Sequence, residues 1–133
     1  MTAPAQSTKP TAQQHLLTSD SGIVLNFIKP DRTADFEAVV AKLKEALQKS
    51  AKPERRQQAA SWKVYRSPEP GPGSSVLYVF TMDPAVKGVD YTVSAILAEA
   101  FPSEAMALLK QYSEAYAAGY NFVNLTLIQD LSK

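Results

Sequence analysis

The order in which hydrophobic periodicity changes along the chain constrains its fold more than any other feature. Residues 23–28 (IVLNFI) form a short apolar run of strand length. A helical period follows, and it places five apolar residues on one stripe: Phe36, Val39, Val40, Leu43 and Leu47. The pattern therefore predicts a strand and then an amphipathic helix.

The middle of the sequence predicts a hairpin. Residues 61–67 (SWKVYRS) and 75–82 (SVLYVFTM) have the composition of strands, and the Pro- and Gly-rich residues 68–73 between them indicate a loop. The polar residues 50–60 include Pro53, so we expect a connection there rather than a regular element.

Helical periodicity returns after Asp90. A first apolar stripe consists of Val93, Ile96, Leu97 and Phe101. Pro102 interrupts the pattern and residues 103–118 continue it, which predicts two helices or one helix with a kink. Gly119 is a natural helix C-cap, and residues 121–129 (NFVNLTLIQ) then predict a last strand.

The resulting order of strand, helix, strand, strand, helix, strand is that of the ferredoxin-like βαββαβ sandwich. An extra helix precedes the second main helix. The 133 residues are enough for one ordinary domain. We therefore expect a single α+β domain over residues 22–133, and a disordered or extended N-terminal tail over the polar residues 1–21.

Alternation within the strands separates two faces of the sheet. One set is wholly apolar, and we expect it to lie under the helices: Ile23, Leu25, Phe27, Leu77, Val79, Val123, Leu125 and Leu127. The far face then mixes apolar and polar groups: Val24, Asn26, Ile28, Val76, Tyr78, Phe80, Phe122, Asn124, Thr126 and Ile128. Either Trp62 and Val64 or Lys63 and Tyr65 join it from the second strand. A surface this apolar predicts an interface or a ligand site.

The amides on this far face are the candidate ligand-binding groups. If the first and last strands are neighbours, Asn26 and Asn124 lie close together among aromatic side chains, which is typical of a small-molecule pocket. We therefore expect Asn26, Trp62, Tyr78 and Asn124 to line one cavity for a small aromatic ligand. The alternative is that the amides bond to each other or to backbone across a dimer interface.

Charge and composition exclude several classes of function. The formal net charge is only +1, so we expect neither nucleic acid nor a membrane surface as a partner. Cysteine is absent, which excludes disulfides, thiolate zinc sites and a thiol nucleophile. The single histidine, His15, lies in the expected tail, so no Ser-His-Asp triad can be assembled. No metal-ligand spacing occurs, and we expect no cofactor.

The sequence is compatible with more than one cellular compartment. No apolar run approaches the roughly 20 residues that cross a bilayer, so we expect a soluble protein. Residues 2–11 (TAPAQSTKPT) are typical of an exported, periplasmic protein just after its signal peptide has been removed. They are equally typical of a disordered tail on a cytoplasmic protein.

Several segments together resemble the dimeric α+β-barrel superfamily and, within it, antibiotic-biosynthesis-monooxygenase-like domains. They are the strand at 23–28, the acidic helix start at 33–37, the hairpin strands at 62–67 and 77–80, and the final strand after Gly119. The resemblance covers residues 22–129. It implies a homodimer in which two sheets pack face to face, with a pocket between each sheet and its helices or within the barrel.

Monooxygenases of that kind use neither metal nor flavin, and they orient a phenolic or quinol substrate that reacts directly with oxygen. The resemblance implies Asn26, Trp62, Tyr78 and Arg66 as the orienting groups. Haem-degrading members hold iron through a histidine, and the position of His15 argues against that role. Two functions therefore remain: a small-molecule-binding domain and a cofactor-independent monooxygenase-like enzyme. We favour the binding domain because no residue pattern in the chain requires a catalytic role.

Overall fold

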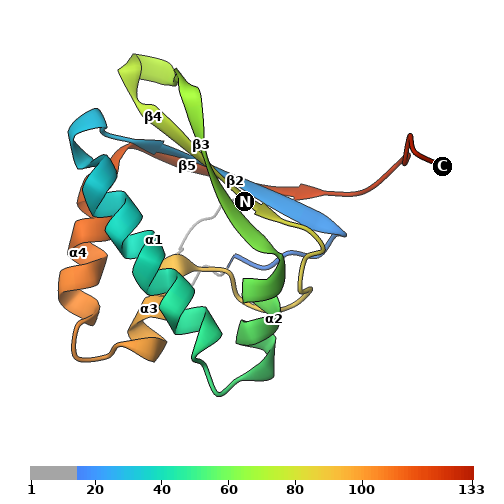
Figure 1. Ribbon diagram of the computed structural model, residues 1–133, viewed down its shortest axis with the longest axis horizontal. Helices are drawn as coiled ribbons and strands as arrows, with labels where there is room; N and C mark the ends of the chain where they lie inside the picture. Colours follow the sequence, from blue (N-terminus) through green and yellow to red (C-terminus); the bar gives the residue numbers. More distant parts are fainter. Residues whose placement is uncertain (1–14) are drawn as a thin grey trace, which may run out of the picture.

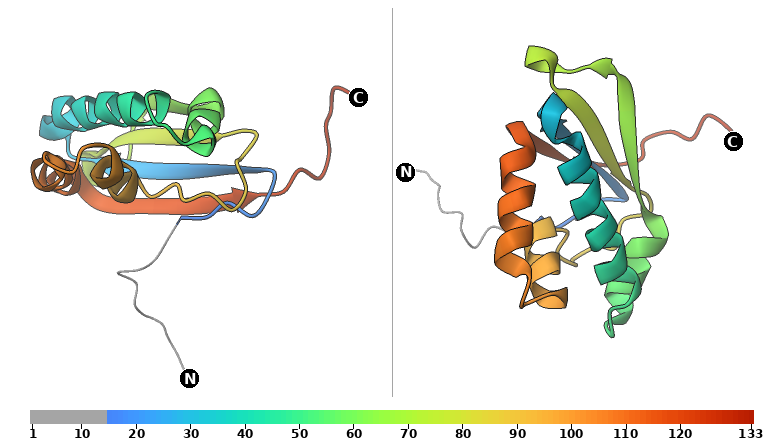
Figure 2. Two further views of the ribbon diagram at one scale, coloured as in Figure 1. Left: turned by 90° about the horizontal axis from the view of Figure 1, so that it is seen from below. Right: turned by 60° about the vertical axis from the view of Figure 1, so that its left-hand side comes forward.

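Four antiparallel strands form one sheet, and the helices pack against one of its faces (Figures 1 and 2). The computed structural model describes residues 15–133. In chain order, the elements are β2 (Ser21–Ile28), α1 (Thr33–Gln48), α2 (Pro53–Ser61), β3 (Trp62–Pro70), β4 (Val76–Met82), α3 (Val93–Ala100), α4 (Ala105–Ala115) and β5 (Tyr116–Leu125). Single 3-10 turns at Pro30–Arg32 and Pro72–Ser74 precede α1 and β4.

The strand order in the sheet is β3-β4-β2-β5, and every neighbouring pair is antiparallel. This α+β arrangement is compatible with the ferredoxin-like plan. The central strand β2 places Asn26 opposite Tyr78 of β4 on one side and opposite Tyr120 of β5 on the other. The pairing of β2 with β5 is irregular next to Phe27, whose partner is Gly119 with φ of 88°.

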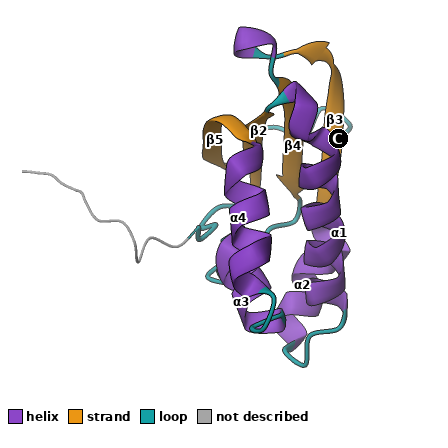
Figure 3. Ribbon diagram, turned by 90° about the vertical axis from the view of Figure 1, so that its left-hand side faces the viewer, coloured by secondary structure: helices purple, strands orange, loops and turns teal. Residues whose placement is uncertain are grey.

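Two main helices lie side by side across the sheet, as Figure 3 shows. Helix α1 buries the expected stripe of Phe36, Val39, Leu43 and Leu47. The two helices expected around Pro102 are present as α3 and α4, so an extra helix does precede the second main helix. Helix α4 ends at Ala115 and β5 begins at once, so Gly119 lies inside a strand rather than at the expected helix end.

Helix α2 lies where we expected a connection without regular structure, over residues 50–60, so that prediction was wrong. Pro53 occupies the first turn of the helix, where the missing N–H would have no intrahelical partner in any case. The two buried side chains of α2 are Arg55 and Gln58. Because this inner face is polar, the helix has no apolar period that the sequence could show.

The helices cover the opposite face of the sheet from the one we expected. Their side contains the buried residues Val24, Asn26, Ile28, Tyr78, Phe80 and Met82. The ring of Phe36 from α1 lies 4.7 Å from the Tyr78 ring, centroid to centroid. Alternation separated the two sets within the strands, but both sets contain many large apolar side chains, so it could not decide which set the helices would cover.

The other side of the sheet is uncovered by the described helices, which all lie below the sheet in Figure 1, and we call it the open face. By register it consists of Ile23, Leu25, Phe27, Lys63, Tyr65, Leu77, Val79, Thr81, Asn121, Val123 and Leu125. Tyr65 is 53% exposed, Val123 37% and Leu125 39%. The open face therefore carries the wholly apolar set that we had placed under the helices, except Leu127, which lies beyond the end of β5.

The folded part of the chain begins before Gly22, where we expected it to start. Leu17 is fully buried, and its carbonyl accepts a hydrogen bond from the Gly88 N–H at 3.2 Å. The His15 carbonyl likewise accepts from the Tyr91 N–H at 2.8 Å. Residues 15–21 thus belong to the domain, whereas the rest of the expected tail, residues 1–14, lies outside the described residues.

The last strand is also displaced from its expected bounds of 121–129, because β5 covers Tyr116–Leu125. Strand β3 runs three residues further than expected, to Pro70. Within residues 15–133, no helix has both the length and the apolar character needed to cross a membrane.

Candidate functional site

The structure brings three of the five candidate residues together and separates the other two. Asn26, Tyr78 and Arg66 are neighbours on the helix side of the sheet. Asn124 pairs with Gly22, four residues along β2 from Asn26, so the two amides do not converge. Its side-chain oxygen accepts a hydrogen bond from the backbone N–H of Thr18 at 3.0 Å. Trp62 lies apart from them, because it is the first residue of β3 and pairs with Met82, four residues along β4 from Tyr78.

The Asn26 amide is fully buried, and protein groups bind both of its ends. Its Nδ2 donates to the Tyr78 carbonyl at 3.1 Å, and its Oδ1 accepts from the Tyr116 hydroxyl at 2.7 Å. The Tyr116 and Tyr112 hydroxyls share a further hydrogen bond at 2.9 Å. We call Asn26, Tyr112 and Tyr116 the amide–tyrosine network. It explains the buried amide without any ligand.

Burial raises the pKa of the Tyr112 and Tyr116 phenols far above the ordinary value. Both hydroxyls are therefore protonated at neutral pH and serve as hydrogen-bonding groups rather than as bases. The Phe36 ring packs edge-on against Tyr116, with centroids 5.8 Å apart. Sequence analysis did not assign Tyr112 and Tyr116 a site role because their helical spacing looks the same as that of ordinary core residues.

A second cluster of polar side chains lies around the Tyr78 hydroxyl. The Tyr78 hydroxyl donates to the Glu37 carboxylate, and Arg66 Nη1 lies 3.3 Å from Glu37 Oε2. The Arg66 guanidinium also lies over the Tyr78 ring, 5.8 Å from its centroid. Burial and the Glu37 hydrogen bond raise the pKa of Tyr78 to about 12. The neutral Tyr78 hydroxyl therefore donates to a carboxylate that also forms an ion pair with Arg66. The charged side chains of Glu37 and Arg66 are both half exposed.

Trp62 lines an apolar groove of about 260 Å³ on the helix side of β3. The groove lies between α1, α2 and β3, and we call it the Trp62 groove. Its lining residues are Val40, Leu43, Lys44, Leu47, Gln48, Ala59, Trp62 and Val64. The Trp62 indole contacts the rings of Phe80 and Tyr91, with centroids 5.6 and 5.1 Å away. Its Nε1 is buried and has no hydrogen-bond partner among the described residues.

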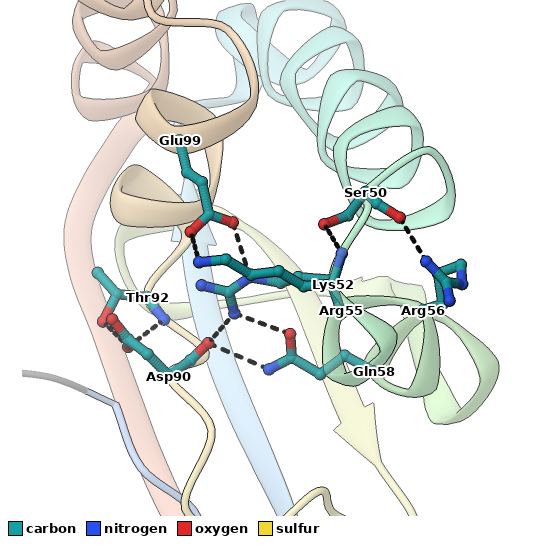
Figure 4. Close-up of polar contacts among 8 residues, drawn as sticks. All are labelled: Ser50, Lys52, Arg55, Arg56, Gln58, Asp90, Thr92 and Glu99. Carbon is teal, nitrogen blue, oxygen red and sulfur yellow. Dashed lines mark hydrogen bonds and ion pairs between the residues drawn. The ribbon is translucent and has the colours of Figure 1, made fainter.

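A charged cluster holds α2 against α3 and the segment before it (Figure 4). The buried Arg55 guanidinium pairs with Glu99 at 3.2 Å and donates to the Asp90 carbonyl at 2.6 Å and to Gln58 at 2.9 Å. Lys52 also binds Glu99, at 2.5 Å, and its hydrogen bond is the main cause that lowers the pKa of that carboxyl. Because Arg55 is satisfied by protein partners, we assign the cluster a structural role.

Within residues 15–133, no three side chains of the metal-binding types His, Cys, Asp and Glu are grouped to hold a metal ion. Comparison of the chain with models of known families, with curated proteins and with solved structures found no match.

Proposed function

We propose that this chain is a homodimeric domain that binds a small, largely apolar molecule, with two copies packed through their open faces as in a dimeric α+β barrel. The observation that carries the proposal is the apolar character of the open face. Ile23, Leu25 and Val79 lie side by side there on two central strands, and the described helices lie on the other side of the sheet. A contiguous apolar surface of this kind indicates an interface or a ligand site.

The width of the open face favours a second copy as its cover. Four strands spaced about 4.8 Å apart make a surface wider than one small molecule would fill. A second sheet fills it well, because packed sheets interdigitate their side chains across a layer about 10 Å thick. Each copy has a net charge of only +1, so two copies repel each other weakly.

The Trp62 groove is the best-supported ligand site, and it lies on the opposite side of the sheet from the proposed interface. Its lining is mainly apolar, and the exposed ammonium of Lys44 provides a positive charge at its rim. A ligand with an apolar body would pack against the Trp62 indole, and an anionic group on that ligand would lie near Lys44.

The monooxygenase-like alternative has less support. It would require a substrate to contact Asn26 and Tyr78, yet the Asn26 amide already bonds to Tyr116 and to the Tyr78 backbone. The Tyr78 hydroxyl already bonds to Glu37. A binding function at the Trp62 groove needs none of these bonds to break.

The binding proposal can be tested by fluorescence, because Trp62 is the only tryptophan in the chain. We expect 8-anilinonaphthalene-1-sulfonate, an aromatic anion, to quench Trp62 emission by energy transfer on binding. Ala59→Phe fills the groove and should weaken this binding about tenfold. Ala41→Phe on the exposed side of α1 is the matched control and should leave it unchanged. Equal affinity in both variants would contradict a ligand site in the groove.

A further inference from the structure

The last eight residues leave the body of the domain and carry large apolar side chains into solvent. Residues 126–133, which we call the C-terminal arm, run outward from the end of β5 (Figures 1 and 2). Leu127 is 67% exposed, Ile128 92% and Leu131 93%. Met106 is the one other large apolar side chain of residues 15–133 with comparable exposure, at 88%. Such a concentration in one short segment indicates a surface that is covered in the assembled protein.

The start of the arm has the sequence of a strand but pairs with no strand among residues 15–133. Residues 126–129 (TLIQ) continue the alternation of β5. Strand β2 begins at Ser21, opposite Leu125, so the ladder ends there. Beyond that point, in the part of the chain that the structure describes, the hydrogen bonds between the arm and the body all involve a side chain of the body, such as the one from the Leu127 N–H to Asp20 Oδ2 at 3.2 Å.

The arm is also continuous with the open face. A shallow groove of about 460 Å³ at this end of the sheet is lined by Ile23 and Leu125 of the open face together with Leu127 and Ile128 of the arm. A body that covers the open face must therefore meet the base of the arm. In a two-fold dimer each arm would meet the partner in the same way.

We propose that the C-terminal arm packs on a second copy of the chain and buries Leu127, Ile128 and Leu131 there. The inference rests on the proposed homodimer. The reach of the arm is sufficient: eight extended residues span about 25 Å, and a four-stranded sheet is roughly 20 Å wide. The arm thus clasps the partner, and the strand-like residues 126–129 gain the neighbour that their own sheet does not provide.

Sedimentation equilibrium tests the arm separately from the dimer. The variant carrying Leu127→Ser, Ile128→Ser and Leu131→Ser should dissociate at least about tenfold more readily than the wild-type dimer. Circular dichroism and the monomer's melting temperature should be unchanged, because these side chains are exposed in the single copy. Met106→Ser removes an equally exposed apolar side chain from α4 and should leave the dimer unaffected.

A spin-label measurement provides a second readout, since the chain has no cysteine of its own. A nitroxide on Ser132→Cys reports the arm, and one on Lys110→Cys reports the body. Narrow distance distributions between copies at both sites support the inference. A narrow distribution for the body with a broad one for the arm, or a triple variant that dimerises as the wild type does, would overturn the arm inference and leave the dimer standing. Absence of any distance between copies at either site would overturn both.

Discussion

The Tyr116 hydroxyl donates a hydrogen bond to the amide oxygen of Asn26 at 2.7 Å, between two neighbouring strands on the side of the sheet that the helices cover. Asn26 is fully buried in the central strand β2, and Tyr116 is the first residue of β5 after helix α4. The contact therefore fixes the point at which the chain turns from α4 into the edge strand. It also identifies the buried amide as part of the framework of the domain.

Removal of this hydroxyl should destabilise the fold. Tyr116→Phe keeps the ring and its packing against Phe36 but leaves Asn26 Oδ1 without its donor. We expect a loss of about 1–3 kcal/mol in the free energy of unfolding, measured by urea denaturation. Tyr120→Phe is the control, since the hydrogen bond between the Tyr120 hydroxyl and His15 Nε2 is exposed to solvent, and it should cost less than about 0.5 kcal/mol.

Asn26→Leu separates a structural amide from a ligand-binding one. The substitution leaves both the Tyr78 carbonyl and the Tyr116 hydroxyl without their buried partner, so the melting temperature should fall. The Trp62 groove is lined by other residues, so the affinity for the anilinonaphthalene probe should stay the same. A variant of unchanged stability that lost probe binding would instead assign Asn26 to the ligand site.

The N-terminal segment should contribute to stability from Leu17 onward. A Cβ added at Gly22 would lie 2.3 Å from Leu17 Cδ2, which shows how closely this side chain packs on the sheet. Leu17→Ala should therefore cost about 2–5 kcal/mol in the free energy of unfolding. Leu16→Ala is a suitable control, because Leu16 is 37% exposed. If the two variants melted at the same temperature, the segment would not be docked as described.

The decrease in the free energy of unfolding at acidic pH should depend on Glu99. Lys52 and Arg55 hold the folded-state pKa of this carboxyl below its ordinary value of 4.5. The ion pairs therefore stabilise the fold above about pH 4.5, and this contribution is lost as the pH falls through the lowered folded-state pKa. Glu99→Gln should cost about 1 kcal/mol at pH 7 and give a flatter stability curve below pH 4.5. Glu114→Gln on the exposed side of α4 should follow the wild-type curve.

The succession of elements could be predicted from the sequence because most of them carry a clear apolar period. Helix α1 and strands β2 and β4 lie close to their expected bounds. Helix α2 could not be predicted, since its inner face consists of Arg55 and Gln58, whose burial depends on partners more than 30 residues away in the chain. The docking of Leu17 depends on a glycine in β2 and on backbone bonds to residues 88–91, which no local pattern reveals.

The candidate site was predicted less well because its geometry depends on which face the helices cover. Asn26 and Tyr78 were correctly placed on one face together, but that face is the core side rather than the far side of the sheet. Asn124 lies on the same face of the sheet as Asn26. It pairs with Gly22, however, which is four residues from Asn26 along β2, so the two amides do not meet. The contact between Glu37 and Tyr78 could not be predicted, because an acidic residue near the start of a helix is usually explained by the helix dipole.

Sedimentation equilibrium of the full chain at micromolar concentration tests whether the open face is covered by a second copy. We expect a mass of about twice 14.5 kDa for the wild type. Leu25→Glu places a charge at the centre of the open face and should give the monomer mass with an intact circular dichroism spectrum, while Met106→Glu on exposed α4 should remain dimeric. A wild-type chain that sediments at 14.5 kDa would overturn the proposed homodimer, because the open face would then have no second copy to cover it.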